Sequence, residues 1–328
     1  MLQDALATGN FLVVGRVGMD FFPDPPGTRT RDATVMRVGM GGSAANTAAG
    51  LVKLGCKAAL VTAVSDDAVG WYCEGQLDHY GVDRSYVKRV RGEYRTSLAV
   101  YETRIEEHQS VIYRNNAADF QMDAADIDAI DFTAYGAVIT AGTVFAAEPS
   151  RSAAFRAFDK AKEAGLPILF DIDYRPYSWP SAAEAEEVLT RAGAMADVIV
   201  GNDEEFGFMA GHIDRGLAKA RALAETSAQM VIYKMGPKGA ITFADGTETR
   251  TGIYPVEAVK PTGAGDSFMA GLLASLSKGR PLKEAVLRGS ACASVVVAKP
   301  GCSPAMPDTD ELEAFLATHP GPTAAQEG

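Results

Sequence analysis

The chain has 328 residues, of which 47% are hydrophobic and 22% are charged, and its formal net charge is −11. This composition is typical of a soluble globular protein with a large core. The acidic excess and the lack of a long basic run argue against a nucleic-acid partner. The N-terminus has no signal-peptide pattern and no apolar segment approaches membrane-spanning length, so we expect a cytoplasmic protein without a membrane partner.

The four cysteines lie in or beside apolar segments and show no CxxC spacing. We expect buried thiols in a reducing compartment, and neither disulfides nor a zinc site. The four histidines form no metal-binding pair such as HExxH.

Short apolar runs and helical patterns alternate along the first part of the chain. Residues 11–14 (FLVV) predict a buried strand, which puts Asp20 just beyond the carboxyl end of a strand, where α/β sheets bind ligands. Residues 21–34 are rich in Pro, Gly and charged side chains and predict an exposed loop. Two further segments predict a strand at 58–64 and a helix at 68–79.

Residues 95–113 have a different pattern. Two runs with alternating apolar residues flank the sequence EEH, which predicts an antiparallel hairpin outside the main sheet. From residue 137 on, β-branched runs alternate with amphipathic helices. The predicted strands are 137–140, 168–171, 198–200 and 230–233, with an antiparallel pair at 239–243 and 247–253. The predicted helices are 150–164, 181–195, 214–226, 264–278, 281–298 and 308–317.

This rhythm predicts an α/β fold, with a mostly parallel sheet covered by helices on both faces. No linker is long enough to separate two domains, so we expect one domain over 1–318. Residues 319–328 (HPGPTAAQEG) predict a disordered tail.

Residues 261–268 (PTGAGDSF) are the most informative stretch. A glycine-rich turn that opens a helix is an anion site, because free N–H groups and the positive end of the helix dipole coincide there. Asp266 is then either a first-turn partner of that dipole or a catalytic base facing a bound anion.

A second glycine-rich stretch covers residues 39–51 (GMGGSAANTAAGL). Asp20, Gly41, Gly42 and Asn46 together suit a ligand with several hydroxyl groups; the alternative is an Asp turn and an Asn inside a helix. The stretch also matches the dinucleotide fingerprint of NAD-dependent oxidoreductases superficially. That interpretation is disfavoured because residues 28–37 are mostly polar, and no buried strand precedes the glycines.

Arg175 lies just past the predicted strand 168–171, and its guanidinium fork suits a carboxylate or phosphate. An ion pair with Asp171 or Asp173 in the same loop is the alternative. Arg114 is a second candidate for binding an acidic group.

Two more junctions carry polar groups. Asn202 and Glu205 have the spacing of a capping box, and only their context supports a phosphate or metal role. Lys234, Gly236 and Gly239 belong to a lysine- and glycine-rich turn that either flanks a nucleotide or is a plain hairpin turn. A GxxxxGK[ST] phosphate loop does not occur in the sequence.

These motifs resemble, in the right order over residues 11–317, those of the ribokinase-like (PfkB) carbohydrate kinases. The first signature corresponds to residues 41–46 (GGSAAN) and the second to 263–266 (GAGD). Residues 202–205 resemble the NxxE motif of the family, and 234–239 the strand and turn before its nucleotide site. The resemblance implies a three-layer ribokinase-like sandwich with a small β lid, formed by about 28–38 and 95–114.

The same resemblance implies residue roles. Asp266 would be the catalytic base, and the N–H groups of Gly263, Ala264 and Gly265 would stabilise the transferring phosphoryl group. ATP would lie near the remaining nucleotide-binding candidates, and Mg²⁺ would be held through water by Glu205. Those nucleotide-binding candidates are Asn202, Lys234, Gly236, Gly239, Gly263, Gly265 and Ala293. The lid is often also a dimer interface in this family, so we expect a homodimer.

A finer resemblance points to family members that phosphorylate keto-deoxy sugar acids, including an enzyme of bacterial myo-inositol breakdown. It rests on residues 113–119, 173–179, 260–266 and 289–307. The expected reaction is phosphorylation of a terminal C6 hydroxyl, with Arg114 and Arg175 binding the acid. Three alternatives stay open: 2-keto-3-deoxygluconate, a neutral sugar such as fructose or ribose, and a catalytically silent sugar-binding relative.

Lys260 departs from the family pattern. Many members carry an Asp three residues before the first glycine of GAGD, where it helps to bind a monovalent cation. We expect the Lys260 ammonium to replace that cation.

Overall fold

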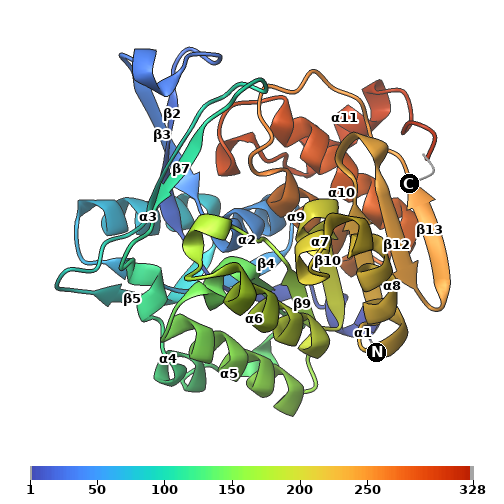
Figure 1. The fold of residues 1–328 in the computed structure, drawn as a ribbon, viewed down its shortest axis with the longest axis horizontal. Helices are drawn as coiled ribbons and strands as arrows, with labels where there is room; N and C mark the ends of the chain where they lie inside the picture. Colours follow the sequence, from blue (N-terminus) through green and yellow to red (C-terminus); the bar gives the residue numbers. More distant parts are fainter. Residues whose placement is uncertain (1, 326–328) are drawn as a thin grey trace.

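The computed structural model describes residues 2–325, and the chain forms a large sheet between two helical layers, with a smaller sheet projecting from one side (Figure 1). The large sheet has nine strands in the order β13-β12-β11-β10-β9-β8-β1-β4-β5. Seven of them are parallel: β1 (Asn10–Val14), β4 (Lys57–Ser65), β5 (Asp83–Val90), β8 (Ala137–Ala141), β9 (Ile168–Asp171), β10 (Val198–Asn202) and β11 (Met230–Lys234). The antiparallel edge consists of β12 (Ala240–Ala244) and β13 (Thr247–Thr251).

Buried strands explain the two helical layers. In β1, Phe11 and Val13 point into one hydrophobic core while Leu12 and Val14 point into the other, as the two-residue period of a strand requires. The first core is covered by α1 (Leu2–Leu6), α2 (Ser43–Lys53), α3 (Ala68–Tyr80), α9 (Ala264–Ser277), α10 (Leu282–Val297) and α11 (Thr309–Thr318). The second is covered by α4 (Ala124–Asp128), α5 (Ser150–Glu163), α6 (Ala182–Met195), α7 (Asp203–Met209) and α8 (Gly216–Thr226).

The smaller sheet has the order β3-β2-β6-β7, and we call it the small sheet. It consists of β2 (Gly18–Pro23), β3 (Met36–Gly41), β6 (Leu98–Tyr101) and β7 (Ser110–Tyr113). The pair β6–β7 is antiparallel, so the predicted hairpin outside the main sheet is confirmed. The predicted α/β fold with helices on both faces is confirmed as well.

Three strands, β2, β3 and β5, were not predicted. Residues 21–34 were expected to be a loop directly after a strand end, but residues 18–23 form β2. Asp20 therefore lies within the small sheet, opposite Gly39 of β3, and not just beyond β1 as predicted. The prolines and charges that follow mask the short apolar alternation of this strand. The edge strand β5 was missed because charged side chains interrupt its apolar residues.

The C-terminal end is partly described. Helix α11 ends at Thr318, and residues 320–325 contain neither helix nor strand. Thr323 exchanges two hydrogen bonds with Ile253: its N–H donates to the carbonyl oxygen at 2.8 Å, and its hydroxyl accepts from the N–H at 3.1 Å. Residues 326–328 of the predicted tail lie outside the described residues, and the single domain over 1–318 stays a prediction.

All four cysteines are buried and unpaired, as expected. Within residues 2–325, none of the helices combines the length and the apolar character needed to cross a membrane. The cytoplasmic location remains a prediction.

Candidate active site

A cleft of about 680 Å³ lies between the carboxyl ends of the parallel strands and the small sheet. Asp171, Asn202 and Lys234, which end β9, β10 and β11, line one side. The opposite side is formed by residues of β2, β6 and β7 in the small sheet. Parallel strands all end at the same edge, which explains why residues far apart in the sequence meet here.

Asp266 faces this cleft from the first turn of α9. The helix starts after Gly263, whose φ of 85° is left-handed and favours glycine. The Asn46 amide nitrogen donates to the Asp266 carboxylate at 2.8 Å, and the Ser303 hydroxyl donates to the Asn46 amide oxygen at 2.6 Å. Asp266 is thus bonded to α2, and not to the backbone of its own turn.

The Asp266 carboxyl has an unusual protonation equilibrium. Burial raises its pKa to about 7, and the neighbouring carboxylates Asp173 and Asp171 act in the same direction, while Asn46 and Arg175 oppose the shift. A carboxyl group with a pKa near neutrality is suited to accept a proton from a hydroxyl group.

Asp20 and the first glycine-rich stretch are in direct contact. One Asp20 carboxylate oxygen lies 1.9 Å from the position that a Cβ on Gly41 would occupy, so any side chain there would displace Asp20. Gly42 adopts a φ of 98° and immediately precedes α2. Burial raises the pKa of Asp20 to about 6, against the opposing charges of Arg16 and Lys260. Asp20, Gly42 and Asn46 all line the cleft.

The capping box at the start of α7 is present. The Asn202 N–H donates to Glu205 and the Glu205 N–H donates to Asn202, both at 2.8 Å. Burial and the Asp171 charge raise the pKa of Glu205 to about 7, while Lys234 opposes the shift. The capping interpretation therefore accounts for the spacing, and a further role in binding phosphate or metal stays a prediction.

The other nucleotide-binding candidates lie in the same cleft. The Lys234 ammonium lies 3.4 Å from the position of a Cβ on Gly265, beside the start of α9. Gly236, Gly239, Gly263, Gly265 and Ala293 all line the cleft. Among residues 2–325, no group of three or more His, Cys, Asp or Glu side chains forms a metal site by itself.

The two predicted acid-binding arginines differ. Arg175 lines the cleft, but its guanidinium forms an ion pair with Asp173 at 2.7 Å, as in the alternative considered from the sequence. Arg114 is buried, and all three of its side-chain nitrogens already donate, to Asp119 and to the Thr143 carbonyl oxygen. Arg114 is not among the residues that line the cleft. This arrangement gives no support to a direct contact of Arg114 with substrate.

Lys260 is completely buried. Its ammonium donates to the carbonyl oxygens of Thr262 and Val296, the latter at 3.1 Å. Burial lowers the pKa of Lys260, while the charges of Cys302, Asp266 and Asp20 raise it. The ammonium therefore bridges the turn before α9 and the end of α10.

Several residues that line the cleft were not predicted. They include Arg16, two residues after β1, Tyr101 and Ile112 of the small sheet, and Thr143, Asp173 and Tyr177 from the segments that follow β8 and β9. The position of Arg16 at the end of a predicted strand was the available signal. The small-sheet residues had none, because their orientation depends on the pairing of distant strands.

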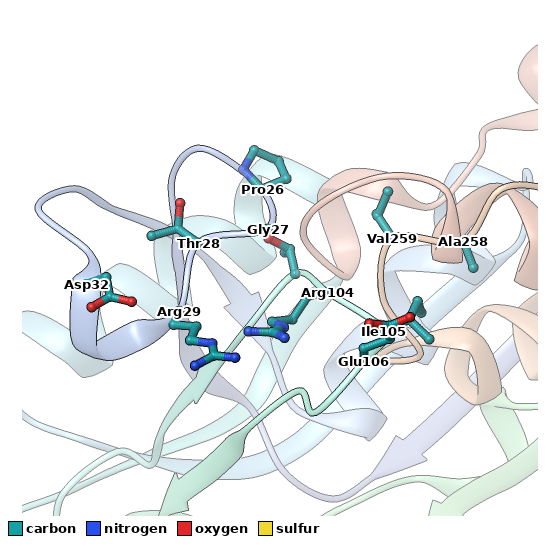
Figure 2. A pocket seen from close by; sticks show the side chains of 11 residues that line it. Pro26, Gly27, Thr28, Arg29, Asp32, Arg104, Ile105, Glu106, Ala258 and Val259 are labelled. Atoms are coloured by element: carbon teal, nitrogen blue, oxygen red, sulfur yellow. The ribbon is translucent and has the colours of Figure 1, made fainter.

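A second cavity of about 750 Å³ lies between the loops at the tip of the small sheet and residues 258–259 (Figure 2). Arg29 and Arg104 are its cationic residues, and both approach Glu107, at 3.1 and 4.0 Å. None of the sequence-predicted catalytic, substrate or nucleotide residues lines it. The cleft, and not this cavity, is therefore the candidate active site.

Known proteins show the family to which the chain belongs. The sequence model of the pfkB family carbohydrate kinases matches residues 9–309. A protein of Geobacillus kaustophilus named 5-dehydro-2-deoxygluconokinase is 34% identical over 322 residues, covering 97% of this chain and 96% of the relative. A protein of the same name from Photobacterium profundum is 33% identical over 312 residues, 94% of each chain.

Among solved structures, a fructokinase double mutant from Vibrio cholerae, bound to fructose, ADP and potassium ion, superposes with a TM-score of 0.84. It is 26% identical, and the match covers 94% of this chain and 98% of the fructokinase. The cleft lies at the carboxyl edge of the sheet, and the two glycine-rich signatures are in contact there through Asn46 and Asp266. Since the family model matches residues 9–309, the chain belongs to the pfkB family of carbohydrate kinases.

Proposed function

We propose that this protein is an ATP-dependent kinase that phosphorylates the C6 hydroxyl of 5-dehydro-2-deoxy-D-gluconate. The resemblance described above implies that this reaction is a step of myo-inositol breakdown. The single observation that carries the kinase chemistry is Asp266, a carboxyl group with a pKa of about 7 at the N-terminus of α9. The choice of substrate is supported by the curated relatives, which bear the name of that kinase.

Asp266 accepts the proton of the sugar hydroxyl as the hydroxyl oxygen bonds to the γ-phosphorus of ATP, and the bond from that phosphorus to the bridging oxygen breaks so that ADP leaves. The N–H groups of Gly263, Ala264 and Gly265 stabilise the negative charge of the phosphoryl group during transfer. Phosphoryl transfer depends mainly on positioning and charge stabilisation, and both are available at the start of this helix. Asp20, Gly41, Gly42 and Asn46 bind the sugar hydroxyl groups.

The nucleotide lies along the other side of the cleft, next to Asn202, Lys234, Gly236, Gly239 and Ala293. Mg²⁺, when bound with ATP, neutralises phosphate charge. The carboxylates of Asp171 and Glu205 fit such an ion, because they are buried oxygen donors whose pKa values are raised mainly by burial, so that a nearby cation would stabilise their charged forms. Glu205 would hold the ion through water. Lys234 is the nearby cation for the phosphates.

Lys260 replaces a monovalent cation. Carbonyl oxygens are the groups that bind such ions in proteins, and here two of them accept hydrogen bonds from a covalently attached ammonium. The positive charge stabilises the turn that precedes Gly263.

The small sheet is the lid over the sugar and the dimer interface. Strand alternation puts Asp20, Ala99 and Tyr101 on the side that lines the cleft. The opposite side carries an apolar row across all four strands, in the pairing Val38–Phe21–Val100–Val111. Val38 and Val111 are 44% and 45% exposed, and Tyr113 is 61% exposed. A second copy of this chain would cover that apolar face.

The kinase assignment is tested by measuring ADP release with a panel of sugar acids and neutral sugars. We expect the highest kcat/KM with 5-dehydro-2-deoxy-D-gluconate, and we expect Asp266→Asn to lower kcat by about 10²–10⁴-fold, the usual contribution of a general base. The wild-type rate should fall as the pH decreases below about 7, since Asp266 becomes protonated. Faster turnover of 2-keto-3-deoxygluconate, fructose or ribose would refute the proposed substrate. No turnover with any sugar would indicate a silent relative.

The raised pKa of Asp266 also predicts an effect on stability. The folded protein retains a proton that the unfolded chain releases between pH 3.8 and about 7, so the contribution of this carboxyl to stability decreases as the pH rises through that interval. Asp266→Asn should therefore raise the free energy of unfolding above pH 7 by about 1 kcal/mol, with a smaller difference near pH 4. Denaturant titrations at both pH values measure this. The exposed Asp310→Asn is the control and should show no comparable gain.

The Lys260 proposal predicts little dependence of activity on potassium. Initial rates should be similar in chloride salts of K⁺, Na⁺ and a bulky organic cation at equal ionic strength. Lys260→Gln should lower the midpoint of thermal unfolding, because the Thr262 and Val296 carbonyls lose their charged donor. A many-fold activation of the wild-type enzyme by K⁺ would refute the proposal.

The dimer proposal predicts that Val111→Asp gives monomers at a concentration where the wild-type protein is dimeric, because a charge in an apolar interface is costly to bury. Light scattering coupled to size-exclusion chromatography measures the mass. The matched control is Ile213→Asp, since Ile213 is 50% exposed and lies outside the small sheet. A monomeric wild-type protein, or an equal effect of both changes, would contradict the proposal.

A further inference from the structure

Arg16 is a buried cation, and one of its guanidinium nitrogens has no acceptor among residues 2–325. It follows β1, lines the cleft and is 7% exposed. Its Nε donates to the Ser97 hydroxyl at 2.6 Å. Its Nη2 is buried and has no hydrogen-bond partner among residues 2–325. A buried guanidinium nitrogen without an acceptor is costly, which indicates that the acceptor comes from outside the chain.

The other two arginines of this region are neutralised by carboxylates of the protein itself. Arg175 is paired with Asp173 at 2.7 Å, and Arg114 is paired with Asp119. Arg16 makes no such ion pair with a described residue, although its charge acts on Asp20 and Tyr177, which both line the cleft. Of these three cations, Arg16 therefore has the donors available for an anionic ligand.

The start of α2 adds a second source of positive potential next to Arg16. The Ala45 N–H donates to the Arg16 carbonyl oxygen at 3.3 Å, so the first turn of the helix is attached to this residue. Within the described chain, the N–H groups of Ser43 and Ala44 have no acceptor, and no side chain caps the helix. Gly42 and Ser43 line the cleft. Free N–H groups at a helix N-terminus favour an anion.

We propose that Arg16, together with the free N–H groups of Ser43 and Ala44, binds the carboxylate of the sugar acid and determines the preference for acid over neutral sugars. This rests on the proposed function. Asn46, which is bonded to Asp266, lies three residues beyond Ser43, or about 4.5 Å further along the helix axis. The proposed carboxylate site and the catalytic carboxyl therefore lie next to the same turn of α2.

The test compares 5-dehydro-2-deoxy-D-gluconate with its neutral counterpart, in which a hydroxymethyl group replaces the carboxylate. The wild-type enzyme should prefer the acid. In Arg16→Gln, KM for the acid should rise about 10- to 100-fold, as expected for the loss of a charge-assisted hydrogen bond. Its kcat should change little, and KM for the neutral sugar should rise much less than KM for the acid. Calorimetric titration of the acid without nucleotide should show the same loss of affinity.

The control variant is Arg288→Gln. Arg288 is also 7% exposed, but it pairs with Glu313 and does not line the cleft. This variant should keep the wild-type preference for the acid. Guanidinium ion at millimolar concentration should partly restore the KM for the acid in Arg16→Ala and should not affect Arg288→Ala. If Arg16→Gln does not fold, Arg16→Lys carries the test, because the ammonium lacks the fork that binds a carboxylate through two hydrogen bonds.

The outcomes separate the two proposals. A wild-type enzyme without preference for the acid would refute the proposed substrate. A wild-type preference that survives in Arg16→Gln, or in Arg16→Lys where only that variant folds, would overturn the role of Arg16 and leave the proposed function intact. Equal losses with acid and neutral sugars would also overturn it, since they would show a structural role only.

Discussion

The hydrogen bond between Asn46 and Asp266 is the contact on which the arrangement of the cleft depends. It joins the first turn of α2 to the first turn of α9, two helices that lie side by side on the same face of the large sheet. Both helices begin after a glycine with positive φ, so both N-termini can approach the cleft closely. The Ser303 hydroxyl orients the Asn46 amide by donating to its oxygen. A bond to a charged group of this kind contributes about 1.5–3 kcal/mol.

Around this contact the protein concentrates acidic groups whose pKa values are raised. Burial raises the pKa of Asp171, Glu205 and Asp266, and the Asp171 charge adds to the shifts of the other two. Lys234 and Arg175 offset only part of that repulsion. Such a site is less stable than an apolar or neutral one would be, which is a common property of catalytic centres. Ligands that bring cations, or hydroxyl groups that accept and donate hydrogen bonds, reduce the repulsion between these carboxylates.

Much of the large sheet was predictable because its central strands are continuous apolar runs between clear helical patterns. The capping box of Asn202 and Glu205 was also predictable, since it depends on residues three apart. The signature glycines and Asp266 were candidates for the same reason: each set lies in a short stretch of sequence.

The remaining features depend on contacts that local sequence does not specify. The strand β2 is short and polar on one side, and its pairing with β3 and β6 determines where Asp20 points. Arg114 was predicted to bind the acid and Arg16 was not considered, although both follow apolar runs. Only the fold shows that Asp119 pairs with the Arg114 guanidinium, while the Arg16 guanidinium keeps a nitrogen without a partner.

The buried Lys260 limits which residues can stand at its position. An apolar residue at this position would leave the Thr262 carbonyl without its Lys260 donor, at about 1–3 kcal/mol for an unsatisfied buried group, whereas the Val296 carbonyl would still accept from the backbone N–H of Lys299. A residue that replaces this lysine therefore has to bring another hydrogen-bond donor to the turn before α9.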